Sequence, residues 1–141
     1  MAYTTIDDPT KYFQNKIYSG TGNSLALTFD GNSNMQPDWV WFKRRDGSAN
    51  HHAYDSVRGV TKAFVPNDTD AETTGSLEGT NYFSSFDSNG FTLAGNNYNN
   101  SNKSGQTYAS WNWKAGTSFT NDASSTGIGS VDSSGSVNET A

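Results

Sequence analysis

The sequence has no cysteine among its 141 residues. A disulfide framework and a thiolate metal site are therefore both excluded. It also lacks any run of about 18 apolar residues, the length that a helix needs to cross a bilayer, so we expect no membrane insertion. The opening stretch, MAYTTIDDPTKYFQ, has no basic end and no apolar run, so we expect no secretory signal peptide. Together these absences favour a protein that is made and assembled in a cytoplasm.

Positive charge is also scarce. Lysine and arginine total 9 against 14 aspartates and glutamates, which leaves a net charge of −5. Such a surface repels a nucleic-acid backbone unless a local basic patch overcomes the repulsion. The only candidate patch is short, and it consists of Lys43, Arg44 and Arg45. We therefore expect no nucleic-acid partner.

Aliphatic residues are few, and the apolar material is largely aromatic. Hydrophobic residues make up 32% of the chain, and 8 Phe, 7 Tyr and 4 Trp account for much of that fraction. A helical bundle lacks its usual leucine and isoleucine here. A few large rings can still fill a small core, because each one buries about 150–250 Å².

Apolar and polar residues alternate with period two in several short segments. Short apolar–polar runs are separated by Gly, Asn, Asp and Ser, which predicts an all-β fold. The runs span residues 13–20, 24–29, 38–45, 51–57, 62–67, 82–95 and 107–115. They amount to about eight short antiparallel strands, as in a β-sandwich or jelly roll. Within 82–95, Asn89-Gly90 predicts a two-residue hairpin turn between strands that carry Phe86 and Phe91.

The tryptophans occur in two period-two pairs. Trp39 and Trp41 belong to DWVWFKRR, residues 38–45, and Trp111 and Trp113 belong to the last strand of the domain. Because aliphatic residues are so few, we expect these pairs to face the core. The basic cluster is then the end of a strand that emerges into solvent.

The last part of the chain differs in composition. Residues 117–141 contain no lysine or arginine and are dominated by Ser, Gly and Thr. This composition is typical of a flexible linker or the start of a stalk. We therefore expect a β-sandwich domain over residues 1–116, followed by a linker.

Few residues suggest chemistry. His51 and His52 are the only histidines, and Asp55 is close to them in sequence. A metal site needs three or four ligands, so we expect no metal, and we expect Asp55 to pair with Arg58 or with Arg45 instead. No nucleophile–base pair, phosphate-binding loop or dinucleotide-binding motif is evident. We expect no enzymatic activity, no catalytic residues and no cofactor.

Several segments resemble a domain of structural proteins from marine bacteriophages, especially cyanophages and pelagiphages. They are MAYTTIDDPTKYFQNKIYSG, DGNSNMQPDWVWFKRR, DSVRG, FDSNGFTLAG and TYASWNWKAG, and together they cover nearly all of residues 1–116. The resemblance implies a virion protein, a component of a tail fibre or another appendage. It also implies a sandwich similar to concanavalin-like and laminin-G-like domains, and no fixed catalytic residues.

The first functional hypothesis is attachment. The β domain would join the appendage to the particle and support host recognition, with other virion proteins and a homotrimer or other homo-oligomer as partners. Lys43, Arg44 and Arg45 are candidate assembly contacts, facing acidic loops such as residues 68–72 of a neighbouring copy. The polar connector after residue 116 favours this hypothesis.

The alternative is a carbohydrate-binding, lectin-like module that contacts host surface glycans directly. Its candidate contact residues are Trp39, Trp41, His51 and Tyr98. Exposed tryptophans would favour this alternative over simple attachment, because exposed Trp and Tyr rings are the usual stacking surface for sugars.

Overall fold

The computed structural model describes residues 7–69, 71–72, 76–77, 80–121, 125 and 133–137. The chain divides into two compact units, of which the larger is Asp8–Lys114. The second unit includes the chain that follows Lys114. Each is described by itself.

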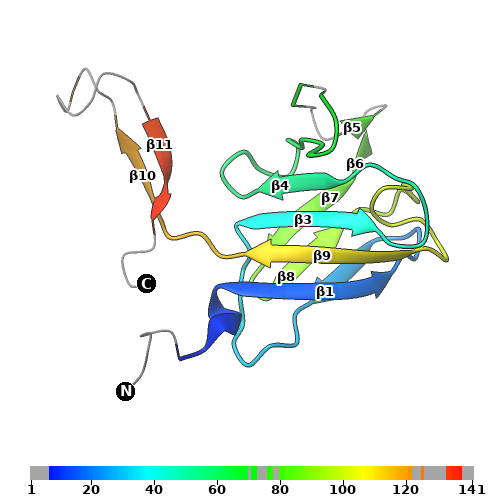
Figure 1. Cartoon of the computed structure of the whole chain (residues 1–141), viewed down its shortest axis with the longest axis horizontal. Helices are drawn as coiled ribbons and strands as arrows, with labels where there is room; N and C mark the ends of the chain where they lie inside the picture. Colours follow the sequence, from blue (N-terminus) through cyan, green and yellow to red (C-terminus); the bar gives the residue numbers. More distant parts are fainter. Residues whose placement is uncertain are drawn as a thin grey trace. The chain divides into compact units, whose positions relative to one another are not determined.

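The larger unit is a β-sandwich of two antiparallel sheets (Figure 1). The four-stranded sheet has the order β1 (Phe13–Ser19), β9 (Thr107–Trp113), β3 (Trp39–Arg44) and β4 (His52–Asp55). The three-stranded sheet has the order β2 (Leu25–Thr28), β8 (Gly90–Leu93) and β7 (Phe83–Asp87). A short 3-10 helix, η1 (Pro9–Lys11), precedes β1, and β5 (Ser76–Leu77) pairs with β6 (Thr80–Asn81). The predicted all-β sandwich is confirmed, and its assignment to a jelly-roll, concanavalin-like or laminin-G-like type stays a prediction.

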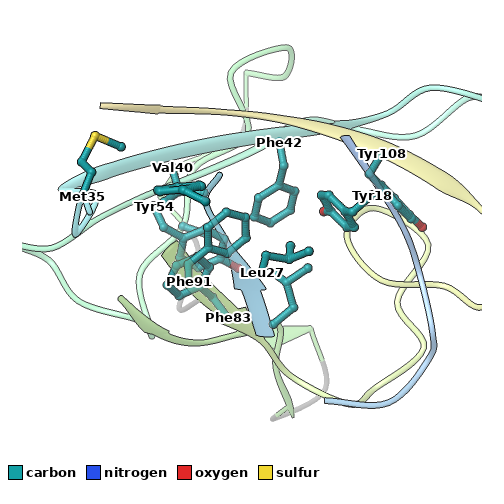
Figure 2. Close-up of a cluster of buried hydrophobic side chains, with 12 residues drawn as sticks. Tyr18, Leu27, Met35, Val40, Phe42, Tyr54, Phe83, Phe91 and Tyr108 are labelled. Carbon is teal, nitrogen blue, oxygen red and sulfur yellow. The ribbon is translucent and has the colours of Figure 1, made fainter. Parts of the chain in front are cut away.

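Aromatic rings fill the space between the two sheets (Figure 2). Tyr54 of β4 stacks on Phe83 of β7 with ring centroids 4.8 Å apart, and Phe83 stacks on Phe91 of β8 at 5.6 Å. The first contact joins one sheet directly to the other, and the second lies within the three-stranded sheet. The core consists of Tyr18, Leu27, Phe29, Met35, Val40, Phe42, Tyr54, Ala63, Phe83, Phe91, Leu93 and Tyr108. The prediction that rings replace aliphatic side chains in the core is confirmed.

The hairpin of β7 and β8 forms as predicted, but its turn lies one residue earlier than predicted. Asp87 pairs with Gly90, so the two turn residues are Ser88 and Asn89, and Gly90 is the first residue of β8. The joined strands carry Phe86 and Phe91, as predicted, and the earlier turn places these two residues opposite each other.

The segment 62–67 was predicted to be a strand, but it contributes a single bridge. Ala53 of β4 and Phe64 exchange two backbone hydrogen bonds, of 3.0 and 3.2 Å. Pro66 follows closely and has no N–H to donate, which limits how far such pairing can extend. This bridge nevertheless covers the outer edge of β4.

The second unit contains a strand pair. β10 (Thr117–Asn121) and β11 (Ser133–Val137) pair antiparallel, with Phe119 opposite Gly135. The segment predicted to be a linker therefore includes regular secondary structure. Its Thr and Val residues are β-branched and suit a strand, whereas the linker interpretation depended on the Ser and Gly content.

Candidate functional site

A group of aromatic side chains lies on the outer face of the four-stranded sheet. Trp39 of β3 lies opposite Trp113 of β9, and Trp41 lies opposite Trp111. Phe13 of β1 lies opposite Trp113 on its other side. Directly opposite residues of neighbouring strands point to the same face, so these rings form two adjacent rows. We call Phe13, Trp39, Trp41, Trp111 and Trp113 the aromatic face.

The rings of the aromatic face contact one another at an angle. The centroids of Trp41 and Trp111 are 5.9 Å apart, with 54° between the ring planes. Those of Phe13 and Trp113 are 5.1 Å apart, at 51°. Tilted aromatic pairs at such distances contribute about 0.5–1.5 kcal/mol beyond the area they bury. The mutual contacts therefore help to hold the indoles in place on the sheet.

This face is open to solvent. Phe13 and Trp113 are each 37% exposed, and Ile17, which follows Phe13 on the same side of β1, is 65% exposed. The other three tryptophans are half-buried. The prediction that the tryptophan pairs face the core is therefore wrong.

The residues at the inner positions of the same strands show why the tryptophans face outward. On β3 the inner residues are Val40 and Phe42, both fully buried, and on β9 they include Ser110 and Asn112, also fully buried. The Asn112 Nδ2 donates to the Gln14 carbonyl at 2.9 Å. The inner position of β9 at Asn112 is thus occupied by a buried polar side chain that is hydrogen-bonded to the backbone of β1.

Charged groups surround the aromatic rows at the β4 side. Phe64 packs on Trp39 with centroids 5.1 Å apart, and the Arg58 guanidinium lies 4.9 Å from the centre of the Phe64 ring. Arg58 forms ion pairs with Asp55 and with Glu72. Of the two alternatives for Asp55, pairing with Arg58 is the one observed.

His51 joins the aromatic face from the loop before β4. Its ring centroid lies 5.8 Å from that of Trp41. Burial, and then the charge of Lys43, lower the pKa of His51 below its ordinary value, so the imidazole is neutral at physiological pH. The Trp41 Nε1 and the His51 Nδ1 are both buried, and neither has a hydrogen-bond partner in the described part of the chain. Trp39, Trp41 and His51, three of the predicted glycan contacts, are thus close together.

Tyr98, the fourth predicted glycan contact, lies elsewhere. Its ring stacks on Tyr82 with centroids 3.6 Å apart and also contacts His52 at 5.7 Å. His52 packs on Phe42, a core residue on the inner side of the sheet. Burial first, and then Tyr82, raise the pKa of Tyr98 to about 12. Tyr98 therefore does not belong to the aromatic face.

The basic cluster is divided between two sides of β3. Lys43 lies on the side of Trp41, and its Nζ donates to the Arg44 carbonyl at 3.2 Å. Arg44 forms an ion pair with Asp46 at 2.6 Å and donates to the Asn99 Oδ1 at 2.8 Å. Arg45 is exposed. Arg44 thus anchors the loop that carries Asn99, so an assembly contact would draw on Lys43 and Arg45.

A family model matches residues 8–141 of this chain, nearly its whole length. The chain belongs to the DUF7483 family. That family is described as a domain of unknown function. No curated protein and no solved structure matches the chain. The matched region includes both the sandwich and the segment after it, so the strand pair β10–β11 lies within the DUF7483 match.

Neither a metal cluster nor a membrane-spanning helix is found in the described part of this DUF7483 chain. Among the residues that the structure describes, no three His, Cys, Asp or Glu side chains are grouped so as to hold a metal ion. Within the same residues, no helix has the length and apolar character that spanning a membrane requires.

Sequence reasoning missed five members of the site: Phe13 and Ile17 on β1, Phe64 of the bridge, and Trp111 and Trp113 as surface residues. Period-two alternation groups residues by face, but it does not say which face is buried. One signal for the exposure of the tryptophans was that the residues alternating with them on β9, Ser110 and Asn112, are polar. It was ambiguous, because buried polar residues and exposed polar residues produce the same pattern.

Proposed function

We propose that this DUF7483 domain is a non-catalytic binding module of a bacteriophage appendage, and that its aromatic face contacts glycans of the host surface. The observation that carries the proposal is the exposure of Trp113 and Phe13 beside three half-buried tryptophans on a sheet face. Contiguous exposed apolar surface rimmed by polar residues marks an interaction site. Exposed tryptophans also favour glycan recognition over simple attachment.

The chemistry of the face suits a sugar. A pyranose presents a flat array of C–H groups on one side and hydroxyls around its rim. The indole rings supply apolar surface for the C–H groups, and Asp55, Arg58 and Lys43 lie near enough in the sheet to meet hydroxyls. Ligand sites commonly combine aromatic walls with a few polar groups in this way.

The appendage setting rests on the resemblance to marine phage structural proteins. On this proposal the protein is located in the virion, its partners are other virion proteins, and it forms a homo-oligomer. The acidic chain, with a net charge of −5, needs local attraction to associate. Lys43 and Arg45 are the members of the basic cluster that an acidic neighbour could contact. The segment after Lys114 would act as the connector to the rest of the appendage.

The replacement Trp113→Ala tests the glycan proposal. The side chain is 37% exposed, so the variant should fold, with a loss of about 2–3 kcal/mol of stability from the buried part of the indole and its contact with Phe13. Binding to arrayed bacterial surface polysaccharides should fall by about tenfold or more, as for a central contact residue.

Tyr98→Phe is the matched control, because Tyr98 lies away from the aromatic face against His52 and Tyr82. It should bind the polysaccharides like the wild type. Equal binding by Trp113→Ala and the wild type would contradict the proposal. A Trp113→Ala protein that fails to join particles, with no glycan binding by the wild type, would favour attachment alone.

A further inference from the structure

Strand β1 has an open hydrogen-bonding edge. Among the residues that the structure describes, it pairs with β9 alone and is the terminal strand of its sheet (Figure 1). The Lys114 N–H donates to the Tyr12 carbonyl, and the Gly20 N–H donates to the Gln106 carbonyl, both at 2.8 Å. Backbone groups of an antiparallel pair alternate in direction along the strand. The N–H and C=O groups of Phe13, Asn15, Ile17 and Ser19 therefore point away from β9.

The opposite edge of the same sheet is closed by the chain itself. Ala53 of β4 exchanges two backbone hydrogen bonds with Phe64. Open edges are usually protected by a proline, an outward charge or a bulge. In β1 the only charged residue is Lys16, and its Nζ is paired with Asp30 at 3.0 Å. The segment 30–33 contacts side chains of β1, since Gly31 and Ser33 bond Gln14 and Asp30 pairs with Lys16. Within the described residues, the outward backbone groups of β1 nevertheless have no backbone partner.

We propose that β1 is a dimer contact, in which it pairs antiparallel with β1 of a second copy of this chain. The proposed register places Phe13 opposite Ile17 of the second copy and Asn15 opposite Asn15. Because the outward backbone groups belong to odd-numbered residues, a two-fold axis through the Asn15 pair lets them meet as hydrogen-bonded pairs. The two four-stranded sheets then join into one.

The side chains of β1 are complementary to themselves in this register. Phe13 is 37% exposed and Ile17 is 65% exposed. Phe13 of each copy would pack on Ile17 of the other, so the two-fold axis produces this contact twice. On the inner side, Gln14 would lie opposite Lys16. A shift by two residues would instead place Lys16 opposite Lys16, and like charges directly opposite are destabilising. The residues at positions 13 to 17 thus favour pairing with a second copy and disfavour that shifted register.

The dimer has a consequence for glycan binding, and this consequence alone rests on the proposed function. An axis perpendicular to the joined sheet keeps both outer faces on the same side. The two aromatic faces would then form one bivalent surface. Bivalent engagement raises overall affinity without any new contact.

A single introduced cysteine tests the register, since the chain has none of its own. The Cα atoms of a hydrogen-bonded antiparallel pair lie about 5.5 Å apart, within the range that a disulfide spans. Full-length Asn15→Cys should therefore form a covalent dimer under mild oxidation. Ser19→Cys, also exposed on the same edge, should not, because the two positions would lie more than about 20 Å apart along the strands.

A second pair of variants tests the interface without oxidation. Ile17→Lys should weaken dimerisation about tenfold or more in sedimentation equilibrium, because it places a charge beside Phe13 of the second copy. Val57→Lys alters another exposed hydrophobic residue, 75% exposed and outside β1, and should leave dimerisation unchanged. Both variants should retain the β circular dichroism spectrum of the wild type.

Three results would overturn the dimer. They are a wild-type chain that stays monomeric or forms trimers, equal cross-linking of the two cysteine variants, and undiminished dimerisation of Ile17→Lys. None of these readouts involves a glycan. The dimer and the glycan proposal can therefore fail separately, the second through Trp113→Ala.

Discussion

At the scale of single residues, buried polar side chains organise this domain. The Gln14 Nε2 donates to the carbonyls of Thr10 and Ser33, and its Oε1 accepts from the Gly31 N–H at 2.9 Å. Asn102, which is fully buried, accepts from the Thr21 N–H and donates to the carbonyls of Asn23 and Ala94. These contacts link loops that are far apart in sequence.

The sequence did not reveal these two roles. Asn102 belongs to AGNNYNNSNKSGQ, residues 94–106, where the composition predicts only a polar loop. Nothing in a run of Asn and Ser distinguishes the residue that is buried from those that are exposed to solvent. Burial is decided by the loops that meet there, at residues 20–24 and 94–95, so it becomes visible only in three dimensions.

The buried imidazole of His52 makes a pH prediction. It is 5% exposed among Phe42, Tyr82 and Tyr98, and burial followed by the nearby His51 lowers its pKa to about 4. The unfolded chain binds this proton near its ordinary pKa of 6.5, so stability is full above that value and falls as the pH decreases towards about 4. Urea unfolding should show a loss of about 2 kcal/mol between about pH 7 and about pH 5.

Two variants assign that loss to a residue. His52→Phe keeps an aromatic ring in the same place and should make stability nearly independent of pH in this window. His51→Gln, on the outer face, should retain most of the dependence. The lowered pKa values of Asp8, Asp30 and Asp46 act only at lower pH, as each falls from 3.8. A wild-type protein with constant stability over the window would refute the assignment.

At the scale of elements, β7 and β8 show what local sequence can and cannot specify. The Asn-Gly pair correctly predicts a hairpin at this point. The bulge between Phe83 and Ser85 was not predicted. It lets Phe83 and Phe86, three residues apart, both pack against the core, although strict alternation would separate them. Only contact with β8 and the opposite sheet selects that irregularity.

Gly90 is the critical residue of this hairpin. Its φ is +126°, and a Cβ there would lie 2.0 Å from the Leu27 carbonyl oxygen of β2. Gly90→Ala should therefore cost at least about 3 kcal/mol, from backbone strain and from displacement of a neighbouring strand. Thermal or urea unfolding measures this loss directly.

Gly59→Ala is the control for Gly90. Gly59 has a similarly positive φ of +82°, but no atom lies within 4 Å of the position that a Cβ would take there. Its replacement should cost only about 1–2 kcal/mol, the strain of the left-handed backbone. If both variants lose the same stability, the close approach of β2 to β8 at this glycine is wrong.

At the scale of the whole molecule, the sandwich has two chemically distinct faces on one sheet. The inner face of the four-stranded sheet packs on β2, β8 and β7, and its outer face carries all the tryptophans. The sequence predicted the all-β class, most strands and the pairing of residues by face. It could not predict which face is buried, because that depends on how much ring volume the second sheet already supplies. The sandwich needs no indole inside, since Phe83, Phe91 and Tyr54 occupy the centre.

The indole N–H signals give the most direct test of the central claim that the aromatic face is the binding surface. All 4 tryptophans of the chain belong to that face, so a heteronuclear NMR spectrum reports on it with few signals. Titration with a bacterial surface polysaccharide should shift or broaden these indole signals and leave the backbone amides around Tyr98 unchanged. The account would be contradicted if the polysaccharide bound elsewhere on the domain without changing the indole signals. It would also be contradicted if the indole signals responded to none of a broad set of surface polysaccharides.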